Sequence, residues 1–265
     1  NNVLWKFSNS FKMKLIFSIA IIILFSFNII AREIGETEIT TEDGIEVFQD
    51  EKYYLLKKNV KILSDNFKLN AKDVKIDFDK SLYDITELNA KGEVNFVSSK
   101  FGLNSKSESL KFEVKIEKLR VNGKNSELIS KDIEMYSDGF IEVNNLNGDF
   151  KLEGLNSKLI NESILIKAEK IDGVFSDNGD QKEITFLNVI DKKISYVKNN
   201  NTEMYAKKIN FDNKISIIEL IDDVIIIRNG EKITGDYGTL DTKNNSYKIK
   251  SNNNTKVKVV IQNNE

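Results

Sequence analysis

Apolar residues recur at every second position along most of the chain, from Ile39 to Ile261. Successive side chains of a β-strand point to opposite faces, so this alternation predicts strands with one apolar and one polar face. No stretch after residue 32 has a convincing helical period. The chain also contains no proline, a residue that interrupts strand pairing. The clearest alternating runs are residues 60–62, 74–78, 94–96, 110–116, 164–168 and 224–226.

Pairs of turn-forming residues separate the alternating runs. Asn-Gly and Asp-Gly pairs favour the tight turns that join antiparallel strands. We therefore expect an all-β, antiparallel fold of about fourteen to seventeen strands. The pairs are Asn122-Gly123, Asp138-Gly139, Asn147-Gly148, Asp172-Gly173, Asn178-Gly179 and Asn229-Gly230.

Composition excludes several classes of function. The 265-residue chain contains no cysteine and no histidine, which rules out thiol nucleophiles, zinc–thiolate sites and Ser-His triads. Lys and Arg number 39 against 41 Asp and Glu, and the net charge of −2 offers no general electrostatic reason to bind nucleic acid. We therefore predict a protein that is not an enzyme, with no catalytic residue, metal site or cofactor, and no nucleic-acid partner.

The N-terminal segment, residues 1–31, reads as a signal peptide or a membrane anchor. An apolar run at residues 15–31 follows Lys12 and Lys14, and no acidic residue precedes Glu33. The run would span about 25 Å as a helix, against about 30 Å for a bilayer core, so a cleaved signal peptide is favoured over a retained anchor. Both alternatives predict export, and Met13 is a candidate start residue.

Residues 56–85 and 220–249 repeat one another. Val60 aligns with Val224, and Asp77 aligns with Asp241; Tyr83 likewise matches Tyr247. A shorter unit, a small residue followed usually by a charged pair and then by apolar–x–apolar, begins at Ala71, Ser130 and Ala206. Looser versions begin at Ser105, Ala168 and Gly235, and the alignment matches Ala71 with Gly235. We expect the small residue at a bend of a curved sheet, and the whole to be a stack of similar β units, either a jelly roll or a solenoid.

Residues 40–48, TTEDGIEVF, followed by Asn59-Val60-Lys61-Ile62, resemble the opening of the OstA-like domain of the LptA-like family of periplasmic lipopolysaccharide-transport proteins. Residues 233–241 resemble the repeated hairpin of that family. The resemblance covers most of residues 37–97 and 220–262, in a chain longer than a typical member. It implies an elongated, antiparallel, twisted β-jelly roll with an open apolar groove, in two OstA-like halves at residues 32–145 and 146–265.

The resemblance also implies a role and partners. The protein would reside in the periplasm, bind the acyl chains of lipopolysaccharide or a related lipid, and pair head to tail with OstA-like proteins at the inner and outer membranes, or with itself. The edge strands for this pairing would contain Ile45, Val47, Val257 and Val259. The groove residues would be Val60, Ile62, Leu69, Ile76, Ile85, Val94, Phe96, Val224, Ile226, Ile233, Leu240 and Ile249.

Other functions remain open. A membrane-anchored, LptC-like subunit or another envelope-biogenesis β protein would retain residues 15–31 as an anchor. An enzyme acting on envelope polysaccharide would need paired carboxylates, but Asp73, Asp77 and Asp79 lie on the polar face of alternating strands, where solvated surface is the default. A structural or adhesive repeat protein would be secreted or displayed on the surface.

Overall fold

The computed structural model describes residues 35–81, 84–162, 164–178, 181–244, 246–252 and 256–261. Residues 1–31, with the expected signal segment, and Tyr83 lie outside the described residues. All of the strands belong to one compact unit, Thr37–Glu265. Within the described part of the chain, no helix is long and apolar enough to cross a membrane.

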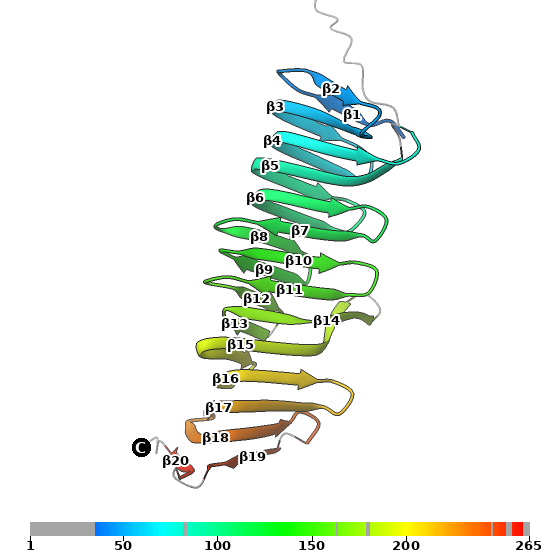
Figure 1. Cartoon of the computed structure of the whole chain (residues 1–265). Coiled ribbons are helices and arrows are strands. Elements are labelled where there is room, and N and C mark those ends of the chain that lie inside the picture. The colour runs from blue at the N-terminus through cyan, green and yellow to red at the C-terminus, as the bar shows by residue number, and fades with distance from the viewer. Residues whose placement is uncertain are drawn as a thin grey trace, which may run out of the picture. The chain divides into compact units, whose positions relative to one another are not determined.

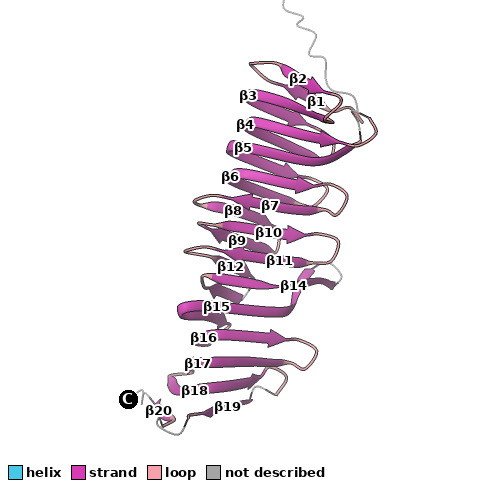
Figure 2. Cartoon of the chain, viewed as in Figure 1, coloured by secondary structure: helices cyan, strands magenta, loops and turns pink. Residues whose placement is uncertain are grey.

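The unit is built from strands and their connecting turns, and the described residues contain no helix (Figure 2). The all-β, antiparallel prediction is therefore confirmed. The described residues form twenty strands, more than expected, because the middle of the chain has two short strands where the ends have one long strand. The strands are β1 (Glu38–Thr40), β2 (Ile45–Phe48), β3 (Tyr53–Leu63), β4 (Phe67–Phe78), β5 (Ile85–Ser98), β6 (Leu103–Glu113), β7 (Lys118–Asn122), β8 (Ser126–Ser130), β9 (Ile133–Ser137), β10 (Phe140–Asn144), β11 (Asp149–Glu153), β12 (Lys158–Asn161), β13 (Ile164–Lys167), β14 (Lys170–Asn178), β15 (Gln181–Asn199), β16 (Thr202–Asp212), β17 (Ile217–Arg228), β18 (Glu231–Asp241), β19 (Ser246–Lys250) and β20 (Lys258–Ile261) (Figure 1).

The strands form two layers that are joined along a corner. The first layer contains β2, β7, β10, β11, β14 and β19, and the second contains β1, β8, β9, β12, β13 and β20; β3–β6 and β15–β18 run through both. Each layer pairs antiparallel, mostly between strands that are near neighbours in the chain. The side opposite the corner is called the mouth, and the turns that join strands of the same layer lie there.

In β3, β5 and β17 a pair of residues with a left-handed backbone lies at the corner. In β3 the register shifts between Lys57 and Val60, and the two residues between them, Lys58 and Asn59, have φ of 64° and 53°. Such residues leave the strand ladder and re-aim the chain, as in a β-bulge. The alternation of inward and outward side chains then resumes in the other layer.

The two aligned segments of the sequence repeat occupy equivalent positions at this corner. Val60 pairs with Ala71 across β3 and β4, and Val224 pairs with Gly235 across β17 and β18. The β17 bulge, residues 222–223, has φ of 61° and 55°, matching the β3 bulge. The repeat and the small residue at the bend are therefore confirmed, whereas the division into halves at residue 145 stays a prediction; β10 and β11 pair across that point.

Inward side chains of both layers pack into one apolar core, and charged residues cover the outside. Leu56, Leu152 and Leu220 are fully buried in it, at the two ends and in the middle. Ion pairs such as Lys111–Glu87, with 2.9 Å between nitrogen and oxygen, lie on the outer faces. The core therefore extends along the whole stack of strands.

Both ends of the stack have edge strands. Among the described strands, β1 and β2 pair only with β3, and β19 and β20 pair only with β18. The outer backbone N–H and C=O groups of these four strands therefore face away from the stack.

Candidate functional site

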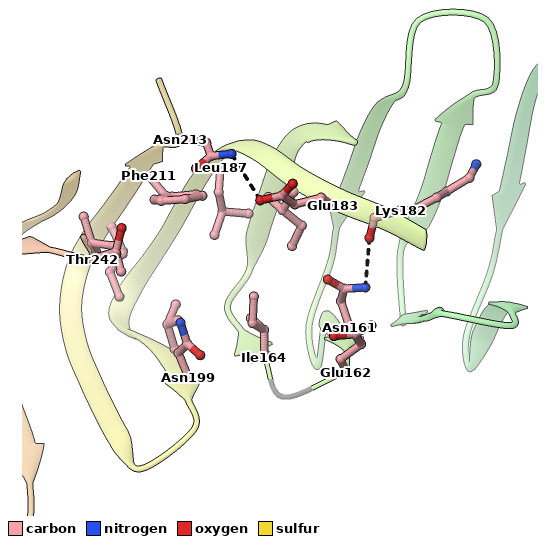
Figure 3. Close-up of a pocket in the computed structure, with 14 residues that line it drawn as sticks. Asn161, Glu162, Ile164, Lys182, Glu183, Leu187, Asn199, Phe211, Asn213 and Thr242 are labelled. Carbon is pink, nitrogen blue, oxygen red and sulfur yellow. Dashed lines mark hydrogen bonds between the residues drawn. The ribbon is translucent and has the colours of Figure 1, made fainter. Parts of the chain in front are cut away.

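A cavity of about 410 Å³ lies between the two layers at the mouth, on the C-terminal side of the stack. Apolar side chains from both layers line it, and Ile164 and Leu187 point into it from opposite layers (Figure 3). Its volume is in the range of small-molecule sites, about 300–1,000 Å³. The apolar lining consists of Ile164, Ile184, Leu187, Val197, Ile209, Phe211 and Ile218.

The rim of this cavity is polar. Amide, hydroxyl and charged groups surround the apolar lining, and the Asn213 amide donates to the Glu183 carboxylate over 3.2 Å. The arrangement can hold an aliphatic chain inside while a polar group of the same molecule stays at the rim, in contact with water. The rim consists of Asn161, Glu162, Lys182, Glu183, Asn199, Asn213 and Thr242.

One hairpin crosses the mouth beside the cavity. It consists of residues 175–178 of β14 and 181–184 of β15 and is called the strap below. A register shift between Val174 and Phe175 separates the strap from the rest of the hairpin. The Phe175 ring is buried and packs against Phe150, with 4.3 Å between ring centroids.

A hydrogen bond joins the strap to the opposite layer. The side-chain amide of Asn161, the last residue of β12, donates to the Lys182 carbonyl over 3.4 Å and to the Asp132 carbonyl over 3.0 Å. Figure 3 shows the first bond, with the Lys182 side chain directed away from Leu187. The strap is thereby fastened across the mouth.

A second, smaller cavity of about 60 Å³ lies on the other side of the strap. Phe175 and Lys182 of the strap line it, and Lys182 lines the larger cavity as well. At this cavity an ion pair also crosses the mouth, with 2.7 Å between Lys100 Nζ and Glu117 Oε1. Hydrogen bonds from Lys100 and from the Asn145 amide lower the pKa of the Glu117 carboxyl.

The predicted groove residues belong to the packed core. Ten of the twelve are buried, and Ile85 and Ile249 are half-buried against the same core. None of the twelve lines either of the two cavities at the mouth. Their role as lipid contacts stays a prediction. The ten buried residues are Val60, Ile62, Leu69, Ile76, Val94, Phe96, Val224, Ile226, Ile233 and Leu240.

The predicted edge residues are exposed at the two ends of the stack. Ile45 and Val47 lie in β2, and Val259 lies in β20, whereas Val257 precedes β20, which begins at Lys258. Between 42% and 53% of the surface of each of the four is exposed. Their role in pairing with another molecule stays a prediction.

Sequence reasoning did not single out the residues that line the cavity. Leu187, Val197 and Ile218 follow the same alternation as the core, so nothing in their own pattern marks them. The strap has one signal in the sequence, the Asn178-Gly179 pair. Among the described residues, no group of three acidic side chains stands close enough to hold a metal ion.

No protein-family model matches the chain, and no curated protein matches it. Among solved structures, the chain is similar to LptH from Pseudomonas aeruginosa, described as the LptA homologous periplasmic component of the lipopolysaccharide transport device. The match has a TM-score of 0.40 and 17% sequence identity, and covers 49% of this chain and 95% of that chain. A likeness this distant assigns no function.

Proposed function

We propose that the protein is a periplasmic lipid carrier that binds acyl chains, those of lipopolysaccharide or a related lipid, between its two layers and passes them toward the outer membrane. One observation carries the proposal: the larger cavity opens at the mouth and is lined by apolar side chains from both layers. The sequence resemblance to the LptA-like family supports the same role.

The lining of the larger cavity is apolar, whereas its rim is polar. Burial of apolar surface contributes about 25 cal/mol per Å², so an aliphatic chain gains free energy by leaving water for a lining of Ile, Leu, Val and Phe. The rim groups, including Asn199, Asn213 and Thr242, can form hydrogen bonds with a polar headgroup. A free sugar or peptide would leave most of its polar groups unpaired against such a lining.

Passing the lipid on requires contact with a second protein, and the ends of the stack offer it. Among the described residues, the edge strands β2 and β20 have no strand on their outer side, so their outer backbone groups can accept an added strand from a partner. Pairing of one end with the opposite end of another molecule is heterologous and does not close, so it produces a linear assembly. The partners in this proposal are OstA-like proteins of the two membranes and further copies of the chain.

A photo-crosslinking amino acid placed in the cavity tests the proposal in cells. At Phe211, which lines the cavity, we expect covalent capture of lipopolysaccharide or another acyl lipid, identified by mass spectrometry. At Asn210, whose side chain bonds Glu219 on the outer face, we expect no capture. Equal capture at both positions, or none at Phe211 in a folded protein, would contradict the proposal.

A filling variant supplies an independent test. Leu187→Trp places a large ring in the cavity, so we expect less acyl lipid to co-purify with this variant than with the native protein. Leu155→Trp is the control because Leu155 is 67% exposed and lies at a turn on the corner side. Undiminished lipid retention in Leu187→Trp would place the ligand outside this cavity.

A further inference from the structure

We propose that the strap closes one end of the larger cavity and limits the length of the acyl chain that the cavity accepts. The inference rests on the proposed function, because it names what that site selects. The residues that set the limit are Asn161 and the strap residues Phe175 and Lys182.

The strap lies between two apolar spaces. The larger cavity has Leu187 and Ile209 on its side of the strap, and the smaller cavity has Phe112 and Met135 on the other side. Lys182 lines both cavities and therefore forms part of the partition between them. Without the strap, the two spaces would form a longer apolar groove.

The Asn161 side chain joins the two layers through two main-chain carbonyls. Asn161 is 6% exposed and points inward, on the face of β12 that also carries the buried Leu159. A buried amide is unfavourable unless it is hydrogen-bonded. Its two bonds, to the Asp132 and Lys182 carbonyls, meet this need and hold the strap against the second layer.

Phe175 holds the strap from the first layer. The ring packs on Phe150 of β11 and lines the smaller cavity, so it occupies the path that a long chain would take past the strap. A chain that enters the larger cavity from the mouth therefore meets the Asn161–Lys182 contact (Figure 3). Beyond that contact it meets Phe175. Its terminal methyl group stops there.

The test measures the affinity of the full-length protein for a graded series of saturated fatty acids, by competition with a fluorescent fatty acid. For the native protein we expect affinity to rise about fourfold per methylene, equivalent to about 0.8 kcal/mol, and to stop rising at one chain length. Asn161→Ala removes both hydrogen bonds and should move this limit to longer chains. Leu187→Phe fills the cavity and should move it to shorter chains.

Asn210→Ala is the matched control, since it removes an asparagine hydrogen bond on the outer face and should leave the limit unchanged. If Asn161→Ala fails to fold, Phe175→Leu tests the same partition, because it shortens the side chain that fills the path and should also lengthen the accepted chain. If the folded strap variant has the same limit on acyl-chain length as the native protein, the strap does not set that limit. The lipid-carrier proposal would then stand. Absence of any fatty-acid or lipid binding by the native protein would overturn both.

Discussion

Gly235 lies directly against Ile249, so that a Cβ atom on Gly235 would stand 2.5 Å from the Ile249 Cγ2 atom and 2.8 Å from the Lys250 carbonyl oxygen. β18 therefore has no room for a side chain at residue 235, where the end of β19 packs against the corner. Because the Lys250 carbonyl is backbone, Gly235→Ala can be accommodated only by moving β19.

We expect Gly235→Ala to lower the free energy of unfolding by about 1–3 kcal/mol, the usual range for overpacking. Urea denaturation measures the effect. Combining it with Ile249→Ala removes one of the two clashes, so the double variant should lose less stability than the sum of the two single variants. Strict additivity would show that the contact does not constrain this corner.

The ion pair across the mouth predicts a dependence of stability on pH. Hydrogen bonds from Lys100 and Asn145 lower the pKa of Glu117, which means that the fold favours the ionised carboxylate. The contribution is therefore present above about pH 4.5, the ordinary pKa of a glutamate, and is lost as pH falls through the lowered value. Glu117→Gln should flatten this part of the stability profile, measured by urea denaturation at a series of pH values below neutrality. An identical acid dependence in the variant would contradict the assignment.

The edge strands predict a concentration-dependent association that charge can block. Lysine on an exposed edge discourages strand pairing, so Val47→Lys and Val259→Lys should each reduce end-to-end association in sedimentation velocity. Because Val47 is 47% exposed and Val259 is 53% exposed, the thermal midpoint should change little. Lysine at Leu155, 67% exposed and away from both ends, is the control. Association that survives both edge variants would require a different interface.

The middle of the stack should be as tightly packed as its ends. Leu152 in β11 is fully buried, and Leu152→Ala should cost about 2–5 kcal/mol of unfolding free energy. Leu155→Ala, three residues further on at an exposed turn, should stay within about 0.5 kcal/mol of the native protein. Similar effects of the two substitutions would indicate that the middle of the core is loosely packed.

Alternation alone predicts which side chains face inward, because every second residue of a strand shares a face. It correctly indicates the burial of Val60, Ile76 and Val224, and the repeat correctly indicates the equivalence of Ala71 and Gly235. The number of strands was underestimated because alternation does not reveal whether a run bends through the corner, as β3 does, or stops there, as β7 does.

The cavity could not be predicted from alternation. Leu187 and Leu240 have the same pattern in the sequence, but only Leu187 lies where the two layers separate near the strap. The strap beside it is defined by the register shift after Val174 and by the Asn161 hydrogen bond to Lys182, a residue 21 positions away. Neither the register shift nor this long-range hydrogen bond can be predicted from the alternation of apolar and polar residues.

Strands pair mostly with near neighbours in the chain. The cross-section of the stack therefore does not depend on how many strands it contains. Duplication of one bent hairpin, such as β16–β17, would add about 10 Å of axial reach, since neighbouring strands lie about 4.8 Å apart. The terminal strands would be unchanged by such an insertion. A chain of this kind can therefore be lengthened by copying a segment, without any change to its two terminal edges.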